Sequence, residues 1–496
     1  MQLRYVDADA VTHGTELLAV AVAQGTEELE GALRALDERL GGAIGRTLSG
    51  GEMQGRPGDV VVVYGGDGGP QRVALIGIGS AEDQNAEVVR RFAGRAVRAA
   101  EKLRLSGVAI SLDGLDGVEP AVRAQSAAEG AALAAWRFRE LKAPDDEAPV
   151  TDVTAVDLVG EGDADAFAAG AVAGAAIARG ENTARTLQSR PGNVATPRHI
   201  ADEAVRVGSG VGLDVTVFDE ERLHEEGMRA LLSVSRGSAE EARLIIMEHK
   251  GGEEGEAPLI LVGKGLSFDA GGISLKPAAG MESMKFDMSG GAAVIGAMQA
   301  IAEVGVQANV VGIVPSSENL PSGTATKPGD VIGSLAGKTI EVINTDAEGR
   351  LILADALAYG AEMKPAAMVD CATLTGAVVV ALGHHAAAVM GNDEALIAEL
   401  IEAGEASGER CWQLPLWDEY RKQLDSTTAD LQNVGGRPGG SITAAAFLAE
   451  FVGDAKWAHL DVAGTAYGEG KLPYQRKGGY GFPTRLLVEW VRSRAG

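Results

Sequence analysis

Apolar runs of strand length alternate with longer helical patterns in the first 160 residues. The runs lie at residues 60–64 (VVVVY), 72–79 (RVALIGIG), 108–112 (VAISL) and 154–160 (TAVDLVG). Between them the pattern predicts a helix capped by Ser80 and reaching about Leu105, a second over 119–142 and a third from about Ala164 to Gln188. This order of elements predicts an α/β unit followed by a long helix.

The rest of the chain repeats the alternation with longer apolar strands. Residues 143–149 (APDDEAP) are polar and flanked by proline, as a linker or exposed loop would be. After a break at 190–197, where Thr196-Pro197 opens a helix, the strand candidates are DVTVFD, RLIIMEH, LILVGKG, NVVGIVP, TIEVINTD, AAMVDCATLTG and KWAHLDVAG. Their alternation with helices predicts a mostly parallel sheet flanked by helices, with a ligand site at the carboxyl ends of its strands.

Composition narrows the classes of partner. The 70 acidic residues outnumber the 44 basic ones, and the net charge of −26 disfavours nucleic acid and anionic lipid. Two cysteines rule out a disulfide framework and cysteine-based zinc modules, and they suit a reducing cytoplasm. The start of the chain has no signal-peptide pattern, and the most membrane-like run, 166–178, is shorter than the ~20 residues of a membrane span. We therefore expect a cytoplasmic protein with no membrane segment, and we interpret Gly170-xxx-Gly174 in this run as close helix packing.

Several familiar motifs are absent or incomplete. Gly77-Ile-Gly79 follows a strand, but Glu82 stands at the third small position of a dinucleotide fingerprint. Gly263-Lys264-Gly265 lacks the rest of a phosphate-binding loop, and no G-x-S-x-G or H-E-x-x-H occurs. We expect the adjacent His384 and His385 to point apart and Cys371 to be a core residue.

Charged residues gather where three apolar segments enter glycine-rich loops. They are Lys264, Asp269, Lys276, Asp287, Asp346, Glu348 and Arg350. Four carboxylates close together repel one another unless positive charge lies between them, and two divalent cations would balance them. Paired cations activate water, and an oxygen-rich ligand set suits Mg²⁺ or Mn²⁺ and also Zn²⁺. A lysine can join such a site only when its amine is neutral. This chemistry leaves amide hydrolysis and phosphoryl transfer both open.

One long motif resembles a known family. NTDAEGRLILADAL (344–357) is similar to the signature of the leucine aminopeptidase family, the cytosol aminopeptidases. The resemblance continues through VGKGLSFDAGGISLKPAAGMESMKFDMSGGAAV, CATLTGA, NVGGRPGGSITAAAFL and WAHLDVAGTA, and it covers about 185–490. The first 160 residues match the family only in general character.

The resemblance implies a dinuclear metal centre. Asp269 and Glu348 would each bridge the two metals, Lys264 and Asp287 would complete the tighter site, and Asp346 would complete the exchangeable one. The metals would be Mn²⁺ or Zn²⁺, with Mg²⁺ as a further candidate. A metal-activated hydroxide would then attack the first peptide carbonyl, releasing N-terminal leucine or other apolar residues from short peptides.

The same resemblance assigns the remaining site residues. Lys276 would stabilise the oxyanion, and Arg350 would hold a bicarbonate ion that acts as general base. The residues sharing that ion would be Ala347, Gly349 and Leu374, and those lining the side-chain pocket would be Met284, Thr373, Gly376, Ala463 and Ala466. The chain departs from the family pattern at Ala466, where some relatives have Met, and at Phe482, where relatives often have Arg.

The resemblance also sharpens the organisation of the chain to two domains. We expect a smaller N-terminal α/β domain at 1–162, a linking helix at 163–188 and a larger catalytic α/β domain at 189–496, assembled as a homohexamer. Two other classes of protein are alternatives. A phosphoryl-transfer enzyme using the same carboxylates is disfavoured by the missing phosphate-binding loop, and a DNA-binding regulator is disfavoured by the acidic charge.

Overall fold

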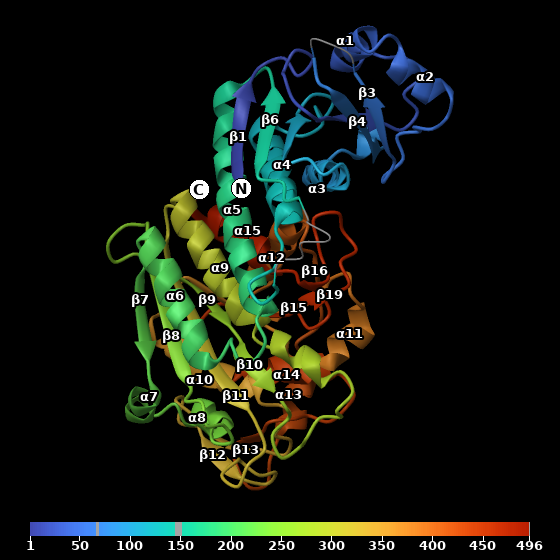
Figure 1. The fold of residues 1–496 in the computed structure, drawn as a ribbon. Helices are drawn as coiled ribbons and strands as arrows, with labels where there is room; N and C mark the ends of the chain where they lie inside the picture. The colour runs from blue at the N-terminus through green and yellow to red at the C-terminus, as the bar shows by residue number, and fades with distance from the viewer. Residues whose placement is uncertain (66–68, 144–150, 496) are drawn as a thin grey trace. The chain divides into compact units, whose positions relative to one another are not determined.

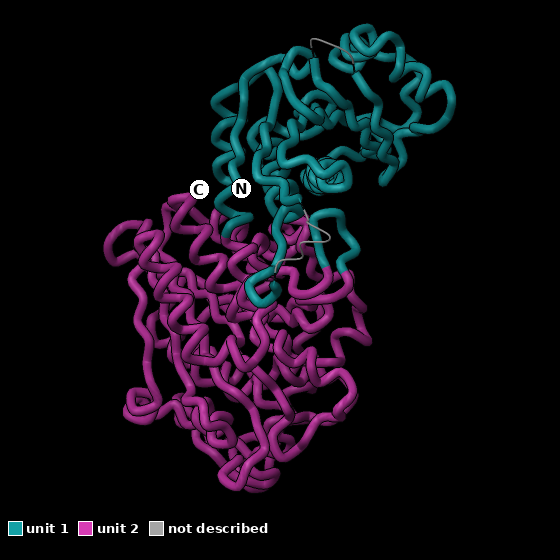
Figure 2. Tube along the Cα trace, in the orientation of Figure 1, with its two compact units in different colours: residues 1–179, 470–476 teal, residues 180–469, 477–496 magenta. Residues whose placement is uncertain are grey.

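The computed structural model describes residues 1–65, 69–143 and 151–495 (Figure 1). The predicted linker at 143–149 lies, apart from Ala143, outside the described residues. The described chain divides into two compact units, one of residues 1–179 with 470–476 and one of 180–469 with 477–496 (Figure 2). The predicted domain boundaries at 162 and 188 stay a prediction.

The first unit is built on a six-stranded sheet in the order β1-β6-β5-β2-β4-β3. All neighbouring pairs are parallel except β3 with β4. The strands are β1 (Gln2–Asp7), β2 (Leu18–Ala23), β3 (Val60–Tyr64), β4 (Arg72–Gly79), β5 (Gly107–Ser111) and β6 (Ala155–Gly160). The four predicted strands are confirmed as β3 to β6, and β1 and β2 were not predicted.

The helices of this unit correct two predictions. They are α1 (Gly31–Arg39), α2 (Ala43–Ser49), the 3-10 turn η1 (Ala81–Asp83), α3 (Ala86–Lys102) and α4 (Pro120–Ala135). Ser80 caps only η1, and the long helix starts later because Asn85 accepts a hydrogen bond from the Val88 amide at 3.1 Å. The helix predicted to reach 142 ends at Ala135, because Trp136 takes an extended backbone conformation.

Helix α5 (Ala164–Ser189) matches the predicted long helix, and the division between the units falls within it. Its small residues allow close packing: an added Cβ at Gly174 would lie 2.3 Å from the backbone oxygen of Gln125 in α4. This confirms the interpretation of Gly170-xxx-Gly174 as a packing motif. No helix among the described residues is long and apolar enough to cross a membrane.

The second unit contains a nine-stranded sheet in the order β16-β15-β18-β14-β9-β11-β8-β7, with β10 beside β11. The parallel pairs are β18–β14, β14–β9, β9–β11, β11–β10 and β15–β16. The antiparallel pairs are β11–β8, β8–β7 and β15–β18. The strands are β7 (Asp214–Phe218), β8 (Arg243–Lys250), β9 (Leu259–Gly263), β10 (Gly265–Asp269), β11 (Asn309–Asn319), β14 (Ala367–Ala372), β15 (Ala387–Gly391), β16 (Cys411–Gln413) and β18 (Trp457–Asp461). The α/β class with a mostly parallel central sheet is confirmed.

Two small sheets lie apart from the central one. One consists of β12 (Val331–Gly333), β13 (Thr339–Glu341) and β17 (Leu431–Gln432), and the other consists of β19 (Tyr467–Gly468) and β20 (Gly478–Gly479). The predicted strand TIEV is thus β13 of a small sheet. Asp346 and Glu348 therefore come from the turn ahead of α10, and not from the end of a central strand as the sequence suggested.

Helices of the second unit position the charged segments. They are α6 (Pro197–Val211), α7 (Glu220–Glu226), α8 (Arg229–Ser235), η2 (Met281–Phe286), α9 (Ser289–Val304), α10 (Gly349–Glu362), α11 (Gly376–Leu382), α12 (Glu394–Ser407), α13 (Asp418–Arg421), η3 (Lys422–Leu424), α14 (Gly440–Ala449) and α15 (Thr484–Ala495). Helices α9 and α10 are buried over most of their length and both pack on β9. Lys264 lies between β9 and β10, Asp287 precedes α9 and Glu348 precedes α10, so these side chains lie at the ends of largely buried elements.

Candidate metal centre

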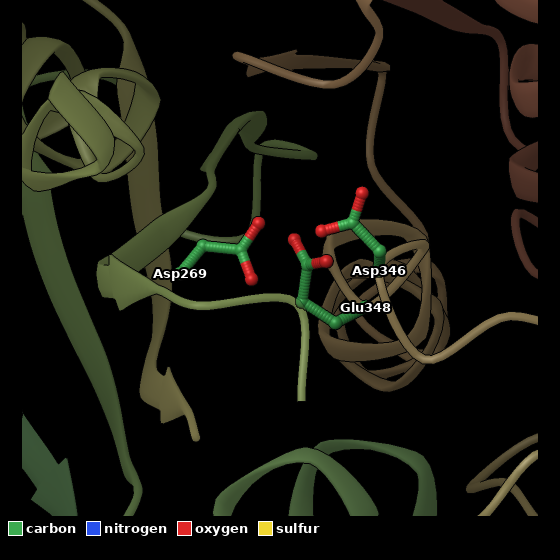
Figure 3. A group of neighbouring side chains, drawn as sticks. All are labelled: Asp269, Asp346 and Glu348. Atoms are coloured by element: carbon green, nitrogen blue, oxygen red, sulfur yellow. The ribbon is translucent and has the colours of Figure 1, made fainter. Parts of the chain in front are cut away.

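Three carboxylates converge at the end of β10. Asp269, Asp346 and Glu348 each place an oxygen within 4.8 Å of the others, and they form a group that could hold a metal ion. Figure 3 shows Asp269 facing Asp346 and Glu348, which come from the turn ahead of α10. The predicted cluster is therefore brought together from segments about 80 residues apart in the sequence.

Lys264 lies on the buried side of this group. Its Nζ donates to Glu348 Oε1 at 2.9 Å and to the backbone oxygen of Thr373 at 3.0 Å, and it is 2.8 Å from Asp287 Oδ2. Burial alone would lower the pKa of Lys264, but the adjacent carboxylates outweigh it and raise that pKa above its usual value. The lysine supplies positive charge that balances the carboxylates around it.

Lys276 occupies the more open side. Its Nζ lies 2.6 Å from Asp269 Oδ2 and 2.5 Å from Asp346 Oδ1. The side chains of Lys276 and Asp346 are 21% and 31% exposed, whereas those of Lys264 and Glu348 are 3% and 4% exposed. The cluster therefore has a closed end at Lys264 and an end at Lys276 that solvent and ligands can reach.

Burial and the repulsion of neighbouring carboxylates raise the pKa values of Asp287, Asp346 and Glu348. Burial, with Asp269 adding repulsion, raises the pKa of Glu348 to about 8. Burial also raises the pKa values of Asp287 and Asp346. Such a site gains stability from any further positive charge that enters it.

The donor set fits divalent cations. Glu348 Oε2 is buried and has no hydrogen-bond partner among the described residues, which is a costly state for a carboxylate oxygen unless a ligand satisfies it. Carboxylate oxygens suit Mn²⁺, Mg²⁺ and Zn²⁺, and the Lys264 amine could join them when neutral. Asp269, Asp346 and Glu348 could thus hold a metal ion, and Asp287 and Lys264 lie beside them.

Glycines allow the segments to approach so closely. Gly271 follows Asp269 with φ +88°, and an added Cβ there would lie 2.8 Å from Asp346 Oδ1. At Gly349 an added Cβ would lie 2.7 Å from Lys264 Nζ. Only residues without a side chain let the loop after β10 and the start of α10 meet around the cluster.

Arg350 lies beside the carboxylates in the first turn of α10. It is buried, its Nη1 donates to the backbone oxygen of Asn433 at 2.6 Å, and its Nε has no hydrogen-bond partner in the described part of the chain. Burial lowers the pKa of Arg350 to about 10, against the opposing charges of Glu348 and Asp461. An anion near this Nε and the first amides of α10 would be favoured.

Two of the residues predicted to share that anion lie within three positions of Arg350 in the chain. Ala347 and Gly349 flank Glu348 in the turn and at the start of α10. The Leu374 amide, in contrast, donates to Asp461 Oδ1 at 3.2 Å, so an anion there would have to share it.

The predicted pocket residues lie in different environments. Thr373 is buried and its Oγ1 donates to Asp287 Oδ1 at 2.7 Å, which ties it to the cluster. Met284, in η2, and Ala463 are half-buried, and Gly376 is exposed at the start of α11. Ala466 has no exposed surface, and its backbone oxygen accepts a hydrogen bond from Gln188.

Cys371, His384 and His385 are not among the candidate metal ligands of the described residues. Cys371 is fully buried, and burial raises the pKa of its thiol well above the usual value. His384 Nδ1 is 2.7 Å from the backbone oxygen of Gly464, and neither His384 nor His385 joins a group of candidate metal ligands among the described residues.

Sequence reasoning missed three buried polar residues that bracket the cluster. Asn319 bonds to Asp269, Asn433 bonds to the turn at 343–347, and Asp461 accepts hydrogen bonds from the amides of Leu374 and Ala463. Asn319 ends an apolar strand, and Asn433 and Asp461 fall within the quoted motifs NVGGRPGG and WAHLDVAG. A polar residue closing an apolar strand was the signal available for Asn319.

Comparisons with known proteins agree on one family. The family model described as "Cytosol aminopeptidase family, catalytic domain" matches residues 182–488, and that for the N-terminal domain of the same family matches 19–145. Among curated proteins, a probable cytosol aminopeptidase of Syntrophotalea carbinolica is 44% identical over 97% of both chains. One of Geobacter sulfurreducens is 44% identical over 94% of both chains.

Solved structures give the same result. A variant of tomato leucine aminopeptidase superposes with a TM-score of 0.90 at 32% identity, over 99% of this chain and 96% of that one. The bottromycin maturation enzyme BotP in complex with Mn superposes with a TM-score of 0.85 at 34% identity, over 97% of this chain and 100% of that one.

Proposed function

The chain belongs to the cytosol aminopeptidase family of metal-dependent aminopeptidases, and from this premise we propose that it is a leucyl aminopeptidase with a dinuclear metal centre. It would release N-terminal leucine and other apolar residues from short peptides. The observation that carries the proposal is the convergence of Asp269, Asp346 and Glu348 between two lysines.

We assign the metal ligands as the family resemblance implies, and the exposure of the two lysines and of Asp346 supports a closed and an open end. Asp269 and Glu348 lie between the two ends of the cluster and would bridge both cations. Lys264 and Asp287 form the closed end, and Asp346 lies at the open end. A buried site exchanges its ion more slowly than an open one, which supports a tight site at Lys264 and an exchangeable site at Asp346. When bound, the cations, Mn²⁺ or Zn²⁺ or else Mg²⁺, would supply Lewis-acid activation of water and of the scissile carbonyl.

Lys276 is the proposed catalytic side chain at the carbonyl. Its position at the open end lets the ammonium donate to the oxygen on which negative charge develops. Burial lowers the pKa of Lys276, but Asp269 and Glu348 outweigh it and raise the pKa above its usual value, so the group stays charged at neutral pH. A charged donor held by two carboxylates needs little reorganisation as the reaction proceeds.

Arg350 is the proposed anchor for a bicarbonate ion. Its unpartnered Nε and the amides around Ala347 and Gly349 favour a small anion, with Leu374 contributing if it shares its amide with Asp461. Bicarbonate would supply a general base that no nearby histidine provides.

The pocket assignment rests on small and apolar side chains. The first side chain of the peptide would be surrounded by Met284, Thr373, Gly376, Ala463 and Ala466. Gly376 is exposed and Ala463 is half-buried, and residues this small would favour a branched aliphatic group such as leucine. We further propose that the enzyme is cytoplasmic and assembles as a homohexamer, with the N-terminal domain, linking helix and catalytic domain divided at 162 and 188.

Hydrolysis of Leu-p-nitroanilide tests the function directly. We expect turnover with added Mn²⁺, loss of turnover after chelation, and a preference for leucine over charged residues in a panel of unblocked dipeptides. Glu348→Gln should lower kcat at least about 100-fold, whereas the exposed control Glu402→Gln should retain full activity. Folded, metal-loaded protein that turns over no unblocked dipeptide would refute the proposal, and phosphate release would point instead to phosphoryl transfer.

A further inference from the structure

Asn319 is a buried amide that touches the proposed metal centre without being one of its ligands. It is the last residue of β11 and lies opposite Asp269 in the register of the β10–β11 pair. Only 5% of Asn319 is exposed. Its Nδ2 donates to Asp269 Oδ1 at 2.8 Å and to the backbone oxygen of Thr345 at 3.0 Å.

These hydrogen bonds select which oxygen of Asp269 faces the cluster. Oδ1 accepts from both Asn319 and the Gly271 amide, each at 2.8 Å. Oδ2 is left on the side of Lys276, 2.6 Å from its Nζ. Without Asn319 the carboxylate could rotate, since one of the two donors that fix it would be gone.

The second hydrogen bond joins two ligand-bearing segments. Thr345 immediately precedes Asp346, and its Oγ1 donates to the backbone oxygen of Gly271 at 2.7 Å and accepts from the Ser274 amide at 2.8 Å. Asn319 thus connects the end of β10 to the turn at 344–348 at their point of contact. This hydrogen bond is one of several that join the segment of Asp269 to the segment of Asp346.

We propose that Asn319 is a positioning residue for divalent-cation binding, which holds the Asp269 carboxylate so that its Oδ2 faces the proposed cation site. The inference rests on the proposed dinuclear centre. It predicts that Asn319 contributes to metal affinity through Asp269, because hydrogen bonds that orient ligands typically change metal affinity ~10–100-fold.

Asn433 offers a matched contrast on the same turn. It has no exposed surface, its Oδ1 accepts from the Ile343 amide at 2.8 Å, and its Nδ2 donates to the backbone oxygen of Asn344 at 2.7 Å. It forms no hydrogen bond with Asp269 among those of the described residues. A variant at Asn433 therefore loosens the turn without releasing Asp269.

The experiment is calorimetric titration of the metal-free full-length protein with Mn²⁺, beside thermal unfolding of the same samples. Asn319→Ala and Asn319→Ser, whose side chains cannot reach Asp269, should weaken at least one of two Mn²⁺ equivalents ~10–100-fold. Asn433→Ala should change Mn²⁺ affinity less than about 3-fold even where its loss of Tm is similar.

Three results would overturn the proposal. In the first, both Asn319 variants bind Mn²⁺ with an affinity within about 2-fold of the wild type. In the second, Asn433→Ala loses as much Mn²⁺ affinity as the Asn319 variants. In the third, neither Asn319 variant folds, which would make the residue purely structural. Titration of the wild-type protein with Mn²⁺ distinguishes failure of the Asn319 proposal from failure of the proposed function. Two bound Mn²⁺ ions without dipeptide hydrolysis would refute the aminopeptidase and leave the comparison of affinities standing, and no bound Mn²⁺ would refute both.

Discussion

Lys276 and Glu348 have different roles at the cluster. The lysine supplies positive charge, and the glutamate supplies an oxygen that could bind a metal ion. Lys276 neutralises Asp269 and Asp346, whereas Glu348 keeps one buried oxygen unpartnered. Removing the lysine leaves the carboxylates more negative, and removing the glutamate takes away a proposed ligand. The two substitutions should therefore affect metal affinity in opposite directions.

Lys276→Ala tests this distinction. We expect kcat for Leu-p-nitroanilide to fall about 10²–10³-fold, as for loss of one oxyanion donor, while Mn²⁺ affinity stays equal or rises. Lys250→Ala is the control and should change neither quantity, because Lys250 is exposed and pairs with Asn309 at the start of β11, whereas the site lies at the other end of that strand. Weaker Mn²⁺ binding in Lys276→Ala would contradict the assignment.

Asp355 gives a prediction about pH. It has no exposed surface and accepts hydrogen bonds from the amides of Ala230, Leu231 and Leu335 at 2.9, 3.0 and 2.7 Å. Burial raises its pKa to about 7 despite these donors. The folded state then binds more protons than the unfolded state, whose carboxyl titrates near ~3.9, so the stabilisation is complete below that value and is lost as pH rises through about 7.

Urea unfolding of wild type and Asp355→Asn at pH 4 to 8 measures this contribution. The free energy of unfolding of the wild type should decline relative to the variant by up to ~1.4 kcal/mol per pH unit within that window. Parallel curves for the two proteins across the whole range would show that Asp355 titrates normally.

At the scale of elements, helix α5 depends on glycines that bring backbones into contact. Its Gly174 packs on α4, and its Gly180 packs on α9, where an added Cβ at Gly296 would lie 2.3 Å from the Gly180 backbone oxygen. A backbone atom cannot rotate away as a side chain can. Helices α5 and α9 must therefore separate if Gly180 or Gly296 gains a side chain.

Gly296→Ala should therefore destabilise the protein by about 1–3 kcal/mol, although alanine favours helix more than glycine. Gly210→Ala is the matched control: Gly210 is an exposed glycine in α6, with no atom within 4 Å of an added Cβ. It should gain up to ~1 kcal/mol. Thermal unfolding of both variants checks the opposite signs, and a stable Gly296→Ala would show that α5 and α9 separate freely.

At the scale of the whole molecule, the excess of acidic residues has two components. Four of the 70 acidic side chains are assigned to cations, which would neutralise them, and the remainder leave a large negative charge. That charge repels itself and opposes the folded state, most strongly when little salt screens it.

Ionic strength should therefore stabilise the metal-free protein. We expect Tm to rise between 0.02 M and 0.5 M NaCl, because the distance over which charges interact falls from above ~10 Å to below it. At fixed salt, a 100-fold excess of Mn²⁺ over its Kd should add about 2.7 kcal/mol per site. Calorimetric Tm values across the two series check both effects, and a Tm that falls with salt would contradict the first.

Elements and the identity of the cluster could be predicted from the sequence because their signals are local. The apolar runs that became β3 to β6 and the Thr196-Pro197 start of α6 depend on residues a few positions apart. The same holds for the motif around Asp346 and Glu348, which indicated the family before the fold was known. The early end of α4 at Ala135 was missed because Trp136 leaves the helix without a proline or glycine to mark it.

The α/β class, the family and the candidate charged residues of the site follow from residues that lie close together in the chain. How those residues meet depends on the fold. Asn319 reaches Asp269 across 50 positions and Asn433 reaches Asn344 across 89, and both pairings depend on strand order and register. Such contacts follow from which segments the folded core brings side by side, and no periodicity along the chain encodes that choice.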